Sequence, residues 1–273
     1  MAGFATLTEG ACGVLGTADA RAKAALSREV ARAWRTGALA EIGNVAPPDR
    51  PARPDRPELL APGRMPKRRS AGSDATRVAL LHALAHIELN AVDLAWDLIA
   101  RFASAEMPRA FFNDWVTVAD EEGLHFLLVA DRLADLGAGY GDLPAHDGLW
   151  EAAAETAHDL MARLAIVPLV LEARGLDVTP GMIRRFDGAG DTASADILRT
   201  ILHDEIGHVA VGKRWFDWVC DRTWNDSADM WRNLVKRHFR GALKPPFNLE
   251  AREKAGFPPD FHIGLCAVAD PGS

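Results

Sequence analysis

The stretch DILRTILHDEIGHVAVGKRWFDW at residues 196–218 contains a glutamate and a histidine three positions apart, Glu205 and His208. Residues at this spacing on an α-helix project from the same side, so both side chains can reach one point. A second copy of the pattern, Glu122 with His125, occurs earlier in the chain. One Glu-x-x-His pair is common by chance, but two copies with further glutamates between and before them indicate a shared metal site.

Both pairs lie in long segments whose apolar residues recur at the helical period. Four long helices are predicted for this part of the chain, and each of the other two carries a lone interior glutamate, Glu88 in the first and Glu172 in the third. A carboxylate among apolar neighbours is costly unless it is paired or bound to a metal. The predicted helices cover about 74–104, 108–137, 147–175 and 192–222.

The order along the chain is Glu, Glu-x-x-His, Glu, Glu-x-x-His. In each half, the lone glutamate precedes the glutamate of the pair by 34 or 33 residues, which suits two antiparallel helices joined by a turn. The 50 residues between the halves leave room for a longer crossover. An all-α four-helix bundle with a long crossover and a dinuclear metal site is therefore predicted. Its ligands would be Glu88, Glu122, His125, Glu172, Glu205 and His208.

Four carboxylates and two imidazoles suit a pair of divalent transition metals. The carboxylates can balance the charge of two ferrous ions in a buried site, and each imidazole supplies one nitrogen ligand while positions stay open for O2. Two iron ions are expected, and manganese or a mixed pair fits the same ligands. The alternative is a purely structural bundle in which the acids and histidines form buried salt bridges.

Two further acids directly precede the paired glutamates. Asp204 and Glu121 are each turned by about 100° from the neighbouring ligand, toward an adjacent helix. Each could accept a hydrogen bond from a ligand histidine of another helix, Asp204 from His125 and Glu121 from His208. The alternative for both is a solvated acid.

Two other histidines, His82 and His86, are four residues apart and share a face. They lie about 240° and 200° around the helix from Glu88, on the wrong side for the same metal. We expect them to pack against a neighbouring segment.

The third predicted helix contains Pro168, which should kink it. Gly175 is typical of a helix end. Thr179 and Pro180 are typical of the start of another helix, a short one reaching Ala189.

The bundle is predicted over residues 74–223, with a flanking region on either side. In the flanking region 1–73, residues 3–43 would be helical and pack outside the main core, with a helical apolar period over 18–36 and Thr17 or Asp19 as a cap. A proline-rich strap would follow up to residue 73. The strap's arginines would pair with the acidic body; the alternative is an RNA- or phosphate-contacting arm. Residues 224–273 would form an extension with one helix near 228–239 and packed irregular chain.

The charge is unevenly distributed, with a net formal charge of −7. The first 70 residues hold 12 basic and 7 acidic side chains, and a basic cluster, RMPKRR, ends that region. The acidic remainder argues against a protein that binds nucleic acid mainly by charge. The three cysteines are far apart and suit a reducing cytoplasm. We expect no secretion signal and no membrane span.

Four segments carry a resemblance to known proteins: LHALAHIEL from Leu81, DEEGLH from Asp120, HDEIGH from His203 and LKPPFN from Leu243. They resemble the ferritin-like superfamily, and within it a bacterial ferritin-like family known as a domain of unknown function. A more distant similarity is to the di-iron tRNA hydroxylase that oxidises an isopentenyl-modified adenosine. The resemblance implies a four-helix bundle with a non-haem di-iron centre.

The function implied is an O2-activating oxidase or monooxygenase that hydroxylates a nucleoside or another small molecule. Such an enzyme needs O2 and a separate electron donor, and the sequence allows a homodimer. The alternative is iron binding or storage, or peroxide detoxification, without a dedicated organic substrate.

Overall fold

The computed structural model describes residues 3–65, 71–103 and 106–262. Within these ranges the protein is all-α, as predicted, and its only β-type pairings are two isolated bridges, Thr6 with Glu41 and Leu59 with Ala145. The chain divides into two compact units. Unit 1 comprises Met1–Glu151 and Ile183–Ile197, and unit 2 comprises Ala152–Met182 and Leu198–Ser273. The ferritin-like bundle and the three predicted domains stay predictions.

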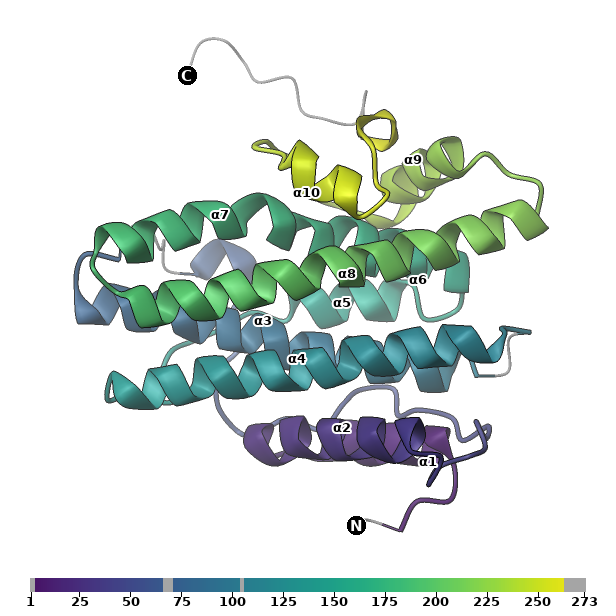
Figure 1. Cartoon of the computed structure of the whole chain (residues 1–273), viewed down its shortest axis with the longest axis horizontal. Helices are drawn as coiled ribbons and strands as arrows, with labels where there is room; N and C mark the ends of the chain where they lie inside the picture. Colours follow the sequence, from purple (N-terminus) through teal and green to yellow (C-terminus); the bar gives the residue numbers. More distant parts are fainter. Residues whose placement is uncertain (1–2, 66–70, 104–105, 263–273) are drawn as a thin grey trace. The chain divides into compact units, whose positions relative to one another are not determined.

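Unit 1 is built on two long helices that lie side by side (Figure 1). The helices of this unit that are complete are α1 Leu7–Leu15, α2 Ala20–Arg35, α3 Asp74–Arg101 and α4 Arg109–Asp135. α1 packs against α3, and α2 packs against α4. The starts of α2 and α3 follow local signals, because Asp19 and Ser73 accept hydrogen bonds from backbone N–H groups of the first turn.

Helix α3 is long and apolar enough to cross a membrane, with a mean hydropathy of 1.3 over 18 residues. The core helix of a globular unit passes the same test, and 78% of that window is buried. Its contacts with α1 and α4 identify it as the core helix of unit 1.

The described part of the proline-rich strap pairs with the acidic body, as predicted. Arg53 bonds to Asp93 at 2.9 Å, and Arg50 pairs with Asp147. Lys23 of α2 reaches the same Asp93 at 2.5 Å and the carbonyl oxygen of Ala52 at 2.8 Å. Two cations therefore offset the cost of burying one carboxylate, and they tie α2, the strap and α3 together. Most of the basic cluster, residues 66–69, lies outside the described residues.

Unit 2 contains most of the third predicted helix, which is not continuous. It is divided into α5 Gly148–Glu155, α6 Leu160–Ile166, the π-helical turn η2 Val167–Glu172, and α7 Ala173–Gly188. The break after α5 arises because Asp159 caps α6, accepting from the N–H groups of Met161 and Ala162. The buried Arg163 then donates to the carbonyl oxygen of Ala153 at 2.7 Å. The predicted kink at Pro168 takes the form of the π turn.

The predicted helix end at Gly175 and the predicted start at Pro180 were both wrong. Helix α7 continues through both positions to Gly188. Proline lacks the N–H that would bond to the carbonyl oxygen of Leu176 four residues earlier. The side-chain amide of Asn248 donates to that oxygen at 3.1 Å, so a residue 72 positions away repairs the break.

Helix α8, Thr192–Arg222, spans the division between the units, as α5 and α7 do. The remaining elements of unit 2 follow it along the chain: α9 Ser227–His238, α10 Leu249–Lys254 and the 3-10 turn η3 Pro259–Phe261. The bounds of α9 are close to the predicted 228–239. α10 was not predicted; Asn248 caps it, accepting from the N–H of Ala251 at 3.2 Å. The two described cysteines, Cys12 and Cys220, are free, and Cys266 lies outside the described residues.

Candidate metal centre

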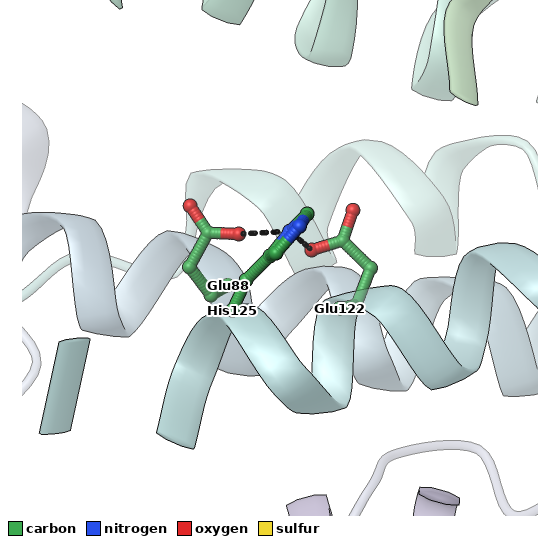
Figure 2. A group of neighbouring side chains, drawn as sticks. All are labelled: Glu88, Glu122 and His125. Atoms are coloured by element: carbon green, nitrogen blue, oxygen red, sulfur yellow. Dashed lines mark ion pairs between the residues drawn. The ribbon is translucent and has the colours of Figure 1, made fainter. Parts of the chain in front are cut away.

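Three predicted ligands come together in unit 1. Glu88 projects from α3, and Glu122 and His125 project from α4, with the imidazole between the two carboxylates (Figure 2). The Nδ1 atom of His125 is 3.4 Å from Oε2 of Glu88 and 3.6 Å from Oε2 of Glu122. One ligand atom from each residue lies within 4.8 Å of the others. The lone glutamate and the Glu-x-x-His pair of this half therefore form one cluster, as predicted.

The helices behind this cluster are tightly packed. Gly123, between Glu122 and His125, faces α2: a Cβ there would lie 2.9 Å from the carbonyl oxygen of Ala24. The hydroxyl of Ser27 donates to the carbonyl oxygen of Ala119 at 2.6 Å and accepts from the indole of Trp96 at 2.7 Å. These contacts join α2 to both α3 and α4 and so hold the two ligand-bearing helices in register.

Without a cation, burying the charged carboxylates of this cluster is unfavourable in free energy. Glu88 is 1% exposed, and Glu122 and His125 are fully buried. The pKa of Glu88 is raised to about 7, chiefly by burial; the hydrogen bond with His125 acts to lower it, and the charge of Glu122 acts to raise it. A divalent metal would reverse this balance by favouring both carboxylates in their charged form. Two carboxylates and one imidazole in a dry site thus fit a transition-metal ion.

Unit 2 contains the second pair, on α8. Nδ1 of His208 lies 3.8 Å from Oε2 of Glu205, and both residues are buried. Glu172, the last residue of η2, is half-buried. The spacing within α8 therefore brings Glu205 and His208 together as the sequence predicted.

Two glycines show where Glu172 lies along α8. A Cβ added at Gly212 would overlap the ring of Pro168, and a Cβ added at Gly175 would lie 4.0 Å from the carboxyl carbon of Glu205. Residue 168 is thus opposite 212, and 175 is opposite 205, so the two segments run antiparallel. In this register Glu172 is level with His208.

The two ligand sets therefore repeat one arrangement. In each set, a lone glutamate on one helix lies level with the histidine of the Glu-x-x-His pair on the antiparallel neighbouring helix. In unit 1 the two side chains are in contact, and in unit 2 the alignment follows from the register of the two segments. They differ in the backbone and in burial, since Glu88 lies buried in regular α-helix and Glu172 is half-buried at the end of a π turn. Such π turns are frequently found at functional sites.

Asp204 and Glu121 are both half-buried, beside Glu205 and Glu122. Their predicted hydrogen bonds to His125 and His208 would join residues of different units and stay predictions.

The prediction for His82 and His86 is confirmed. Nε2 of His86 lies 2.9 Å from the carbonyl oxygen of His146, so this nitrogen carries the proton, and Nδ1 accepts from the hydroxyl of Tyr140 at 2.9 Å. Burial lowers the pKa of His86 to about 4, which keeps it neutral at pH 7. Nε2 of His82 accepts from the N–H of Gly141 at 3.0 Å. Both histidines hold the loop after α4.

Sequence reasoning missed the two glycines that set the register in unit 2. A signal for each was present in the sequence. Gly175 follows Glu172 by three residues, and Gly212 follows His208 by four, so each shares a helical face with a ligand.

Comparison with known proteins gives two matches. Residues 16–262 match the sequence model of a family described as "Protein of unknown function (DUF455)". The chain is 42% identical over 225 residues to an uncharacterized protein of Haemophilus influenzae (strain ATCC 51907 / DSM 11121 / KW20 / Rd), covering 80% of this chain and 78% of that protein. No solved structure gives a significant match.

Proposed function

The chain belongs to the DUF455 family, and we propose that it is a dinuclear metalloprotein of the ferritin-like kind that activates O2 as an oxidase or monooxygenase. The observation that carries the proposal is the buried cluster of Glu88, Glu122 and His125 in unit 1. The same arrangement recurs in unit 2, which supports a pair of ions rather than one. The full ligand set is then Glu88, Glu122, His125, Glu172, Glu205 and His208.

The donor types favour iron or manganese. Four carboxylates leave two divalent ions almost neutral, and the two imidazoles add one nitrogen each. When bound, such a metal pair would transfer to O2 the electrons that it receives. The substrate we favour is a small organic molecule, including a nucleoside, and electrons would come from a separate donor.

The side chains around the cluster keep water away from it. Leu81, Leu84 and Ala85 precede Glu88 on α3 and are all buried. Val118 and Val129, one turn to either side of the α4 ligands, are buried as well. This apolar lining strengthens each metal–ligand interaction, because charges attract more strongly where water is excluded.

Metal analysis after anaerobic reconstitution with ferrous iron tests the proposal. We expect about two ions per chain, the number held by six-ligand sites of this type. The variants E122A and E205A should each lose iron, whereas E151A, at an exposed position on α5, should keep it. Less than about half an equivalent in the wild-type protein, or full retention in E122A, would refute the ligand assignment.

A second measurement separates catalysis from storage. An oxidase should consume O2 without building a mineral core, and deletion of the gene should change a metabolite or a tRNA modification. Large mineral cores formed with peroxide would instead show an iron-storage protein.

A further inference from the structure

The π turn η2, residues Val167–Glu172, needs support from the rest of unit 2. A π-helical turn is rare and persists where the surrounding structure imposes it. Pro168 within it has no N–H to donate, which weakens the local hydrogen bonding further. Glu172, the ligand assigned to this turn, is therefore held by contacts from outside the helix.

One such contact lies just before η2. The indole N–H of Trp231, on α9, donates to the carbonyl oxygen of Ala165 at 3.0 Å. Trp231 is fully buried and packs edge-on against Phe257, with 5.2 Å between ring centroids. The end of α6 is thus anchored to the C-terminal region.

A stronger set of contacts lies just after η2. Asp177 accepts from Nε of Arg252 at 2.9 Å and from Nη2 at 2.7 Å, and also from the N–H of Asn248 at 2.9 Å. Arg252 is 4% exposed, and its guanidinium lies 5.1 Å from the ring centroid of Phe247 and 5.3 Å from that of Phe257. Such a bidentate, buried pair requires the planar fork of arginine.

Two more bonds join the same turn of α7 to the C-terminal region. Asn248 supplies the hydrogen bond to Leu176 that Pro180 removes, as described above. Nη1 of Arg174 donates to the carbonyl oxygen of Lys244 at 2.6 Å. The C-terminal region thus contacts the helix on both sides of η2.

We propose that residues 231–257 form a clamp that positions Glu172 by holding the turns on either side of η2. Trp231 holds the preceding turn, and Asn248 and Arg252 hold the following one. These are positioning residues, since they act through the backbone that carries Glu172. The inference rests on the proposed function only in assigning Glu172 as a ligand.

Amide hydrogen exchange of the metal-free protein tests the clamp without any metal. W231F removes the indole N–H but keeps an aromatic ring, and R252K keeps the charge but loses the bidentate fork. The control is K254M, which removes an exposed ion pair with Glu250 on the same helix α10. We expect amides of residues 166–177 to exchange about 10-fold faster in W231F and R252K, as loss of one bond to a buried group implies. Unchanged exchange there, or equal acceleration in α3 and α4, would overturn the clamp.

Anaerobic titration with Co²⁺, followed by visible absorption, tests the positioning of Glu172. Wild type and K254M should bind two ions, and both clamp variants should bind the second ion about 10-fold more weakly, with an altered spectrum. Faster exchange together with wild-type affinity and spectrum would overturn the positioning role. If the wild-type protein binds no Co²⁺, the proposed function fails, while the exchange measurement still decides whether the clamp holds η2.

Discussion

Replacing Glu88 with glutamine should make the stability of the metal-free protein less dependent on pH. Burial and the neighbouring charge of Glu122 raise the pKa of Glu88 from 4.5 to about 7. A carboxyl group with a raised pKa binds more protons in the folded state than in the unfolded state between these two values. The free energy of unfolding of the wild-type protein should therefore fall as the pH rises from 4.5 to 7 and then level off.

The size of the effect follows from the two pKa values. Between pH 5 and pH 8 this one carboxyl should cost the wild-type protein about 2–3 kcal/mol, because a tenfold difference in proton affinity corresponds to about 1.4 kcal/mol. Glutamine has a similar shape and does not titrate. The difference in stability between E88Q and wild type should therefore move by about 2–3 kcal/mol in favour of E88Q over this range.

Urea denaturation in the presence of EDTA at pH 5 and pH 8 measures this difference. Comparing two pH values cancels any fixed cost of the substitution, such as a poorer contact between the amide and His125. E151Q, at an exposed position on α5, provides the control and should follow wild type at both pH values. A difference in pH response below about 0.5 kcal/mol, close to the error of urea extrapolation, would refute the electrostatic account of the cluster.

Three other predictions follow from the same structure. Metal uptake near pH 7 should release protons from the unit 1 cluster and weaken as the pH falls, which a weakly buffered titration would detect; uptake without proton release would contradict it. D93N should lower the free energy of unfolding by about 3–5 kcal/mol because it leaves Lys23 buried without its carboxylate. G212A should cost about 1–3 kcal/mol through overlap with the Pro168 ring, whereas G207A, with open space at the same helix, should add about 0.5–1 kcal/mol. Urea denaturation checks both, and equal effects of the two glycine substitutions would refute the register.

Local spacing placed the glutamate and histidine of each Glu-x-x-His pair together because the geometry of one helical turn is independent of the fold. Glu122 with His125 and Glu205 with His208 lie as the helical period requires. The same reasoning placed His86 away from Glu88, and the loop it binds confirms that assignment. Residues three or four apart can therefore be judged from the sequence.

The prediction was wrong where distant residues act on the backbone. Gly175 and Pro180 are reliable signals for helix ends in isolation, yet α7 continues through both. The donor that compensates for Pro180 is Asn248, on a segment whose packing no local pattern reveals. The break before Asp159 was missed because the apolar period continues across it.

The sequence by itself determined the all-α class, most helix starts, and the proximity of glutamate and histidine in the two Glu-x-x-His pairs. These depend on period, capping and i, i+3 spacing, which act over a few residues. Only the tertiary structure decided that Glu88 reaches His125 from another helix, and that Glu172 ends a π turn level with His208. Those features depend on the packing of helices distant in the chain, where glycines allow close approach and buried polar groups must find partners.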